Sequence, residues 1–400
     1  MLGLLSYREL GLINPDRVEK AECTRRSLAT ELSRLQDVKS VHTGSINTLD
    51  LDIVEGRYLL SGSTVGCLAV HDLHNIQKSP KCTYEAIFQI KRQHEGAHQF
   101  SVETVQWYPM DTGMFTSSGV DKRLKVWDTN MLVVADEFKF NSIIYHHDIS
   151  SVASQHSLIA ISSQSSKVRL VDLKSGSQTH TLKGHKQAVY VAKWSPRDEY
   201  LVASGSADNK VYLWDVRSSK GSMMVLDQHN GDTKAGPHSV NTAHNGCING
   251  LCFTPDGLHI MTYGTDNRVR YWSSLSGKNT MVNFGKIENE SKKTVQICTS
   301  YNTSPEIAYV PTDNNIEMFD LSSGEKINTL RGHYNQVNCV LFDWQTQHLY
   351  SGGNDRNILV WTPETLTTDS ESGNADSKSL NTNKFTQRVG TADAWSDDED

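Results

Sequence analysis

Four stretches of the chain repeat the same residues at the same spacing, and this periodicity constrains the fold more than any other feature. Each has a Ser or Thr, an Asp four residues later and a Trp six residues after that Asp, with a His about thirty residues before the Trp. The four sets are His98, Ser117, Asp121 and Trp127; His185, Ser204, Asp208 and Trp214; His244, Thr262, Asp266 and Trp272; and His333, Ser351, Asp355 and Trp361. A period of about 40–45 residues predicts β-propeller blades.

The four sets resemble the structural tetrads of WD-repeat blades. In that family the Trp, the hydroxyl, the His and the turn Asp form a buried hydrogen-bond chain that links the strands of one sheet. A Ser–His–Asp hydrolase built from Ser204, His185 and Asp208 is the alternative. The same set is present four times, however, whereas an enzyme needs one site. We therefore expect scaffold residues, no catalytic residue and no intrinsic enzymatic turnover.

Three further blades fit the gaps between the four clear ones. In the segments 46–73, 157–176 and 305–324, the Trp position is taken by His71, Val171 and Phe319. The β-branched and aromatic residues of these stretches favour short strands, and turn sequences such as Ser-Pro-Arg-Asp separate them. The expected fold class is all-β, a single seven-bladed WD-repeat β-propeller over residues 37–363.

The ends of the chain suggest how the ring closes. No strand signal follows Trp361–Pro363, so the last blade needs a strand from elsewhere. The segment Asp37–Gly44 precedes the first blade, and we expect Val38–Val41 to supply that strand and remove an open edge. Residues before Asp37 are then expected to be dispensable for folding of the ring.

Two segments are expected outside the ring. Val18, Ala21, Leu28, Leu32 and Leu35 recur at three- and four-residue steps, which predicts an amphipathic helix that begins at the cap Asn14-Pro15-Asp16. With a shorter apolar turn at Leu2–Leu10, residues 1–36 would form a helical hairpin. Residues 364–400 are rich in Ser, Thr, Asn and Asp and are expected to be a disordered acidic tail, with Phe385 and Trp395 as isolated aromatic residues.

Composition narrows the classes of function. The formal net charge of −7 argues against a surface that coats nucleic acid, so direct DNA contact is not expected. No apolar run approaches the roughly 18 residues needed to span a membrane, and Arg8 and Glu9 argue against a signal peptide. Seven cysteines without a C-x-x-C pair fit reduced thiols of a cytosolic or nuclear protein.

No sequence motif predicts a cofactor or a metal. A Gly-rich phosphate loop, an H-E-x-x-H motif and a nucleophile elbow are all missing from the sequence. The pair His71 and His74 and the run His146-His147-Asp148 are the metal candidates, at roughly one chance in twenty each, because histidines at strand ends are usually hydrogen-bonded or solvated.

One blade end differs from the others. Arg217 follows Trp214-Asp215-Val216, whereas Asn130, Lys174, Ser322 and Glu364 stand at or near the matching places. An Arg that leaves an inner strand at this point would lie on one rim of the ring. It is either paired with a neighbouring carboxylate or an anchor for a partner protein, since Arg is enriched at interface hot spots. The predicted helical hairpin on the same ring favours the partner.

The run VASGSADNKVYLWDVR, Val202 to Arg217, resembles the box of substrate receptors of cullin-4 RING ubiquitin ligases. In that family the box Arg contacts the damaged-DNA-binding adaptor, and an N-terminal helical hairpin inserts into a cleft of the adaptor. The resemblance implies adaptor contacts at Asp215 and Arg217. The apolar positions of the hairpin, Leu28, Leu32 and Leu35, would then be further anchors.

The similarity to excision-repair members of this family extends over essentially the whole chain. It runs through MLGLLS, TRRSLATEL, VETVQWYPMDTGMFTSS, LDQHN, NTAHNG, FTPDGLHIMTYGTDNR and DAWSDDED. It implies transcription-coupled nucleotide excision repair in the nucleus, with the Cockayne syndrome B remodeller and stalled RNA polymerase II as partners beside the adaptor. A generic WD-repeat scaffold in another nuclear or cytosolic complex is the alternative, and a direct damage-binding protein is the weaker third hypothesis.

Overall fold

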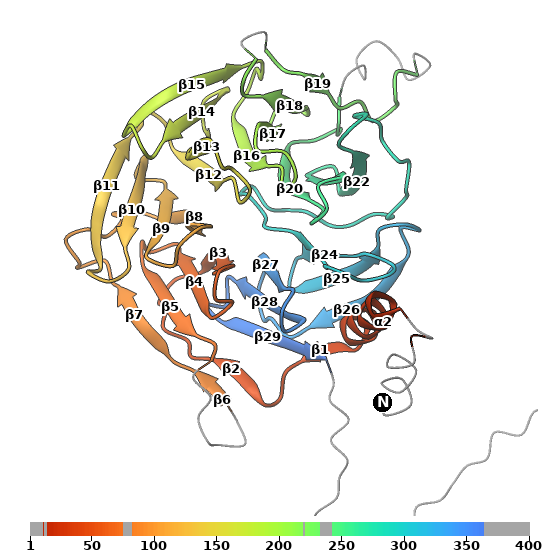
Figure 1. The fold of residues 1–400 in the computed structure, drawn as a ribbon, viewed down its shortest axis with the longest axis horizontal. Helices are drawn as coiled ribbons and strands as arrows, with labels where there is room; N and C mark the ends of the chain where they lie inside the picture. The colour runs from red at the N-terminus through yellow and green to blue at the C-terminus, as the bar shows by residue number, and fades with distance from the viewer. Residues whose placement is uncertain (1–10, 12–13, 75–81, 219–220, 233–241, 364–400) are drawn as a thin grey trace, which may run out of the picture. The chain divides into compact units, whose positions relative to one another are not determined.

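The computed structural model describes residues 11, 14–74, 82–218, 221–232 and 242–363. Within them, seven sheets of three or four antiparallel strands stand around a common axis, which is the predicted seven-bladed propeller (Figure 1). The expected first helical turn at Leu2–Leu10 and the expected tail at 364–400 lie outside the described residues.

Six blades are each built from one continuous stretch of chain. Blade 1 contains β3 (Ile46–Leu51), β4 (Tyr58–Ser63), β5 (Leu68–Asp72) and β7 (Ala86–Ile90); blade 2 contains β8 (Val102–Trp107), β9 (Met114–Gly119), β10 (Arg123–Asp128) and β11 (Val133–Lys139); blade 3 contains β12 (Ile144–Ile149), β13 (Leu158–Ser163), β14 (Lys167–Asp172) and β15 (Ser177–Lys183). Blade 4 contains β16 (Val189–Trp194), β17 (Leu201–Ser206), β18 (Val211–Asp215) and β19 (Met224–Val225); blade 5 contains β20 (Ile248–Phe253), β21 (His259–Gly264) and β22 (Arg268–Ser273); blade 6 contains β23 (Cys298–Thr299), β24 (Ile307–Thr312), β25 (Asn315–Asp320) and β26 (Lys326–Arg331).

Blade 7 joins the two ends of the ring, but with a different strand from the predicted one. It contains β27 (Val337–Asp343), β28 (His348–Gly353) and β29 (Ile358–Pro363), and its outer strand is β1 (Thr30–Leu32). Thr30 pairs with Pro363 and Leu32 with Trp361. Closure by an N-terminal strand is therefore confirmed, whereas its placement at Val38–Val41 is wrong. Thr30–Leu32, which precede Asp37, are thus part of the ring.

The segment that was expected to close the ring pairs elsewhere. β2 (Gln36–Val38) runs parallel to β6 (Cys82–Tyr84), and Val38 lies opposite Tyr84. The chain from Ser33 to Lys39 thus passes from blade 7 to the outer side of blade 1. Lys39 also forms an ion pair with Glu85 at 2.8 Å. This segment, residues 33–39, is called the strap below.

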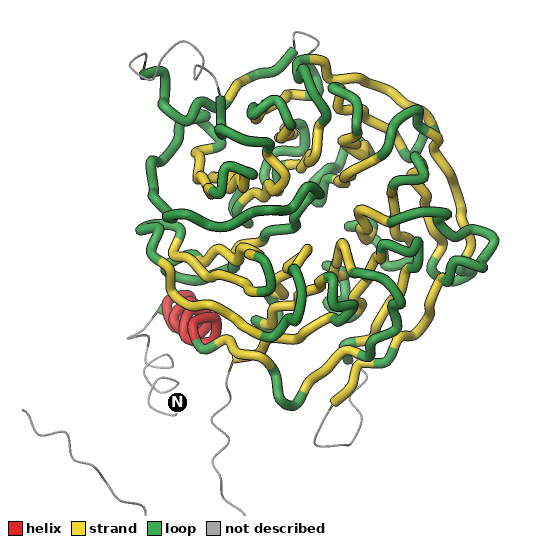
Figure 2. Tube along the Cα trace, turned by 180° about the vertical axis from the view of Figure 1, so that it is seen from behind, coloured by secondary structure: helices red, strands yellow, loops and turns green. Residues whose placement is uncertain are grey.

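The helix α2 (Pro15–Leu28) begins where the sequence predicts and ends earlier. The Asn14 side chain accepts a hydrogen bond from the Asp16 amide at 2.9 Å, and Pro15 occupies the first turn, so the predicted cap is confirmed. The predicted continuation to Leu35 is wrong, because β29 offers a free edge that draws Thr30–Leu32 into the sheet. Figure 2 shows the helix at the edge of the ring from the opposite side.

The core lies between neighbouring blades. One cluster, for example, joins Leu170 of blade 3 to Val189 and Trp214 of blade 4. The cluster at the closure joins blades 7 and 1 and includes Val38 and Tyr84 of the β2–β6 pair. Because each blade packs on the next, the turns of all seven are held at defined places on two opposite rims. The described residues contain no helix that could span a membrane.

Candidate protein-interaction rim

All four predicted tetrads are assembled as hydrogen-bonded chains. In blade 4, the indole Nε1 of Trp214 donates to Ser204 Oγ at 2.8 Å, Ser204 is hydrogen-bonded to His185 Nε2 at 2.8 Å, and His185 Nδ1 lies 3.0 Å from Asp208 Oδ2. The sets of Trp127, Trp272 and Trp361 are connected in the same way, with every distance between 2.6 and 2.9 Å. Each chain links the second and third strands of its blade, the turn between them and the connection that precedes the blade.

Burial decides what these serine–histidine–aspartate chains can do. The hydroxyl residues Ser117, Ser204, Thr262 and Ser351 are each 0% exposed, so a substrate has no access to their oxygens. Burial opposes ionisation of Asp208, but its hydrogen bonds with His185 and with two backbone amides outweigh burial and hold the pKa of Asp208 below its usual range. An ionised Asp and a donating His Nδ1 leave His Nε2 to accept from the hydroxyl. The geometry is that of a structural chain.

The three degenerate blades keep the strand register and lose the tetrad. His71 lies opposite Leu59 and Val171 opposite Ile159, as Trp214 lies opposite Val202. Blade 1 retains one tetrad contact, between His42 Nε2 and Ser61 Oγ at 2.7 Å. The sequence reasoning missed His42, although it stands at the tetrad spacing, 29 residues before His71 (71 − 42).

The two candidate metal clusters engage in hydrogen bonds. His147 contacts Thr116 Oγ1 at 2.8 Å and Ser118 Oγ at 2.6 Å, and His71 Nε2 lies 3.3 Å from the Lys39 carbonyl oxygen. No group of three His, Cys, Asp or Glu side chains suited to a metal ion is found in the described part of the chain. All seven cysteines are free thiols.

Arg217 is both paired and accessible. Its guanidinium donates to Asp215 Oδ1 at 3.0 Å and Oδ2 at 2.8 Å, and it lies over the ring of Tyr200, 4.4 Å from the centroid. The hydrogen bond from Arg217 holds the pKa of Asp215 below its usual range. The Arg217 side chain is nevertheless 59% exposed. These contacts fix the position of the exposed guanidinium and leave the N–H groups of Nη1 to donate to an acceptor on a partner.

Arg217 belongs to the rim that carries the turns between first and second strands and between third and fourth strands of the blades. We call this the Arg217 rim. A groove of about 710 Å³ borders Arg217, and its wall includes the exposed side chains of Val152, Met223 and Leu275. These come from blades 3, 4 and 5, so the groove spans three neighbouring blades.

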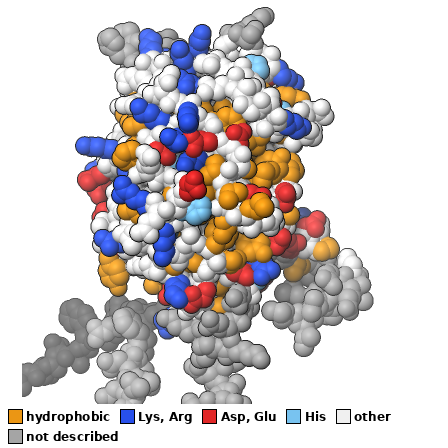
Figure 3. Space-filling model, turned by 90° about the vertical axis from the view of Figure 1, so that its left-hand side faces the viewer, with side chains coloured by type: hydrophobic (Ala, Val, Ile, Leu, Met, Phe, Trp, Pro, Cys, Tyr) orange, Lys and Arg blue, Asp and Glu red, His pale blue; other side chains and the backbone are white. Residues whose placement is uncertain are grey.

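Exposed apolar side chains gather on the Arg217 rim in every blade. Nine lie in its turns or directly beside them: Ile53, Val54, Met110, Met131, Val152, Met223, Leu275, Tyr301 and Trp344. On the opposite rim, the described turns and connections carry Phe100 and Tyr334. The edge view of Figure 3 shows hydrophobic side chains concentrated on one part of the surface and Lys and Arg on another. The three of these side chains that share the groove beside Arg217 (Val152, Met223 and Leu275) favour a protein interface at this part of the rim.

The helix α2 is anchored on the same rim. Thr24 Oγ1 accepts from the Ser304 amide at 2.8 Å in the turn of blade 6, and Arg26 donates to the Thr346 carbonyl at 3.2 Å in the turn of blade 7. Tyr301 and Trp344, from these two turns, contact each other edge to face at 5.7 Å. The helix and Arg217 are therefore parts of one rim.

The three predicted leucine anchors are exposed but do not share a helical face. Leu28 ends α2, Leu32 lies in β1 and Leu35 follows it before the strap pairs with β6. Their exposed fractions are 42%, 40% and 51%. They form an apolar line from the Arg217 rim up the outer edge of blade 7, instead of the predicted stripe on a helix.

Comparison with known proteins agrees with this architecture. The WD domain, G-beta repeat model matches residues 90–128, 176–215, 237–273 and 324–362. WD repeat-containing protein ATCSA-1 of Arabidopsis thaliana is 32% identical over 91% of this chain and 95% of its own length. The chain belongs to the WD-repeat family. The four matched stretches contain or adjoin the four WD-repeat tetrads described above.

Two other matches cover less of the chain. Radiation-sensitive protein 28 of Saccharomyces cerevisiae is 24% identical over 44% of this chain and 38% of its own length. The Ribosome biogenesis protein WDR12 homolog of Culex quinquefasciatus is 30% identical over 44% of this chain and 37% of its own length. These two matches cover fewer than half of the residues of this chain, whereas the Arabidopsis match includes segments outside the four clear WD repeats.

Proposed function

We propose that this WD-repeat protein is the non-catalytic substrate receptor of a cullin-4 RING ubiquitin ligase that acts in transcription-coupled nucleotide excision repair. The observation that carries the proposal is that Arg217, helix α2 and the nine exposed apolar side chains occupy one rim. A receptor needs such a surface for its adaptor and a second surface for its substrate. It needs no catalytic residue of its own.

The repair role draws on similarity along the whole chain. The sequence resembles the Cockayne syndrome WD-repeat protein A, and the names of the Arabidopsis relative and of the yeast radiation-sensitive protein are consistent with repair. The partners in this proposal are the damaged-DNA-binding adaptor of the ligase, the Cockayne syndrome B remodeller and the RNA polymerase II repair complex. The proposed compartment is the nucleus.

A generic WD-repeat scaffold is the competing function. The match to a ribosome biogenesis protein over 44% of the chain shows how much similarity the repeats alone produce. Such a scaffold would have the ring and no use for an accessible, preoriented Arg217 beside an anchored helix. Recovery of the cullin adaptor with the purified chain separates the two functions.

The test is a titration of the purified adaptor against the full chain and two variants. A deletion of residues 1–28 removes α2 and keeps β1, so the ring should still close. We expect this deletion to abolish adaptor binding, because it removes the helix that completes the rim. Arg217→Ala should weaken binding by about tenfold, or about 1.4 kcal/mol.

The control is Arg331→Ala, which removes an exposed Arg at the far end of β26 and should leave adaptor binding unchanged. Melting temperatures of all proteins should agree within a few degrees, as the Arg217 ion pair is exposed. If the folded deletion binds the adaptor as tightly as the full chain, the receptor mechanism is wrong.

A further inference from the structure

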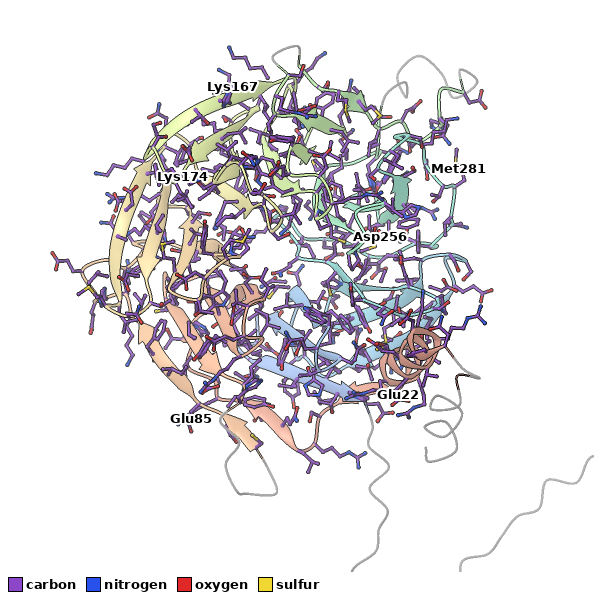
Figure 4. The ribbon with its side chains drawn as sticks, in the orientation of Figure 1. Glu22, Glu85, Lys167, Lys174, Asp256 and Met281 are labelled. Carbon is purple, nitrogen blue, oxygen red and sulfur yellow. The ribbon has the colours of Figure 1, made fainter. Side chains whose placement is uncertain are left out.

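The axis of the ring contains a cavity that the receptor function does not use. It has a volume of about 320 Å³ and is lined by residues from all seven blades. Ser151, Pro196 and Pro255 line it from turns of the Arg217 rim, so the cavity reaches that rim. In Figure 4, Asp256, the neighbour of Pro255, lies towards the centre of the ring, whereas Met281 lies at its outer edge.

The charges in the cavity wall do not balance. Asp50 of β3, Asp148 of β12 and Lys193 of β16 line it. Lys193 Nζ donates to Asp148 Oδ1 at 2.9 Å, and the other oxygen of Asp148 accepts from the Trp194 amide at 2.7 Å. The ammonium group is thus committed to Asp148. Two carboxylates and one ammonium leave a formal charge of −1 (−2 + 1).

Asp50 is the carboxylate without a cation. Its Oδ2 accepts from the Trp107 amide at 2.7 Å, and no Lys or Arg of the described residues lies within ion-pairing distance of it. Burial raises the pKa of Asp50 to about 7, against the opposing effects of the Trp107 amide and of Lys193. A cation placed beside Asp50 would complete the pairing that the wall itself leaves open.

Two buried polar groups in the same wall also lack partners. His146 Nδ1 and Trp194 Nε1 have no hydrogen-bond partner among the described residues. His146 is 7% and Trp194 4% exposed, and both line the cavity. An unpaired buried polar group costs about 1–3 kcal/mol, so native proteins seldom keep one without a partner from the protein, ordered water or a ligand. A neutral His146 can accept at Nδ1 from an ammonium or guanidinium donor, independently of the acidic pair, whereas the Trp194 indole N–H donates only and needs a different partner.

The rest of the wall is suited to an aliphatic chain. Val191, Phe253 and Leu341 contribute apolar surface beside the charged groups. Lys and Arg side chains combine an apolar stem with a cationic head in the same way. We propose that the axial cavity binds a primary ammonium or guanidinium group on an aliphatic stem, with Asp50 as its counter-ion.

The group could be the basic side chain of a polypeptide docked on the Arg217 rim or a free polyamine, which share this chemistry. The proposal does not depend on the ligase function. The first experiment measures the melting temperature of the full chain with n-butylammonium chloride, with sodium chloride at equal ionic strength and with n-butanol. We expect n-butylammonium alone to raise it, by about 2 °C or more near saturation.

Asp50→Asn keeps an acceptor for the Trp107 amide and removes the charge, so it should abolish the butylammonium effect. Glu325→Gln, which neutralises an exposed carboxylate in the β25–β26 turn of the same rim, is the matched control and should retain it. An equal shift in Asp50→Asn and the full chain, or an equal shift with butanol, would overturn the proposal.

Lys193→Met tests the site in the opposite direction, because it increases the negative charge of the cavity instead of reducing it. It leaves Asp50 and Asp148 without their ammonium neighbour, so the variant should melt below the full chain and regain more stability from butylammonium than the full chain does. A purely structural role of Asp50 predicts no such rescue. Recovery with sodium chloride to the same extent would contradict the site.

A last comparison separates the two sources of the cationic group. N-acetyl-lysine N-methylamide mimics a side chain within a polypeptide, and spermidine represents free polyamines. Tighter binding of the blocked lysine supports a partner polypeptide, and tighter binding of spermidine supports a polyamine site. In both cases Asp50→Asn should weaken binding at least tenfold. If neither compound binds, the proposal is overturned.

Discussion

Blade 4 and blade 1 have the same strand register and are held together by different residues. Blade 4 has the full chain from Trp214 through Ser204 and His185 to Asp208. Blade 1 has only His42 and Ser61 of that chain, with His71 in the place of the Trp and Val65 in the place of the Asp.

The strap supplies what blade 1 lacks. His71 Nε2 lies 3.3 Å from the carbonyl oxygen of Lys39, and β2 pairs with β6 beside it. Blade 4 is thus fixed by an internal tetrad, whereas blade 1, beside the closure, is held in addition by a segment from the N-terminus.

Removing the closing strand should have the largest effect on this comparison. A deletion of residues 1–33 takes away β1, including the bond from the Ser33 amide to the Val360 carbonyl at 2.9 Å, and exposes the edge of β29. At about 1 kcal/mol per lost hydrogen bond we expect the free energy of unfolding to fall by about 2–4 kcal/mol.

Urea unfolding measures this loss, with the deletion of residues 1–28 as control because it keeps β1. Hydrogen exchange should increase first in blades 7 and 1 and leave blade 4 protected. Equal stability of the two deletions would show that β1 does not hold the ring closed.

Breaking the tetrad of blade 4 should have the next largest effect. Asp208→Ala leaves the buried Nδ1 of His185 without its partner, which should cost about 1–3 kcal/mol. Thermal unfolding would be compared with Asp136→Ala, which removes an exposed carboxylate from β11. Unchanged melting combined with loss of a specific activity would instead favour a catalytic role.

Val65→Asp makes the reciprocal change in blade 1. It places a carboxylate where the tetrad Asp stands in the other blades, within the turn that follows β4. Because His42 Nδ1 is buried without a partner, we expect a gain in stability of up to about 1 kcal/mol at pH 7. A loss of stability would mean that the strap already satisfies blade 1.

The smallest effect at neutral pH is expected from titration of buried histidines. The pH dependence of stability should therefore distinguish blade 1 from blade 4. Burial lowers the pKa of His42 to about 4, assisted by the proximity of His71, and burial likewise lowers the pKa of His71 to about 4. The unfolded chain therefore binds more protons between about pH 6.5 and pH 4. The stabilisation is fully present above pH 6.5 and is lost as the pH falls towards 4.

We expect each of these histidines to lower the free energy of unfolding by on the order of 1–2 kcal/mol when the pH falls from 7 to 5. His71→Phe introduces the residue type that Phe319 provides at the same position of blade 6. It should reduce the change in the free energy of unfolding with pH, measured by urea unfolding. His180→Phe on exposed β15 should leave it intact. An unchanged slope in His71→Phe would show that the acid sensitivity arises elsewhere.

The sequence by itself determined the repeating parts of this protein. The spacing of His, Ser or Thr, Asp and Trp predicts the blades and the tetrads, because each blade forms its contacts within about forty residues. The start of α2 was predictable for the same reason, since Asn14 caps a helix two residues away. Arg217 was predictable as a rim residue, because it follows a strand whose direction the repeat defines.

Only the tertiary structure decided how the ends meet and what the axis contains. Thr30–Leu32 is too short to show strand alternation, and it becomes a strand because β29 presents a free edge. The three- to four-residue spacing of Leu28, Leu32 and Leu35 therefore predicted a helix where the chain turns into a sheet. Asp50, Asp148 and Lys193 are distant in sequence and meet because closing the ring brings the inner strands of all seven blades around one axis.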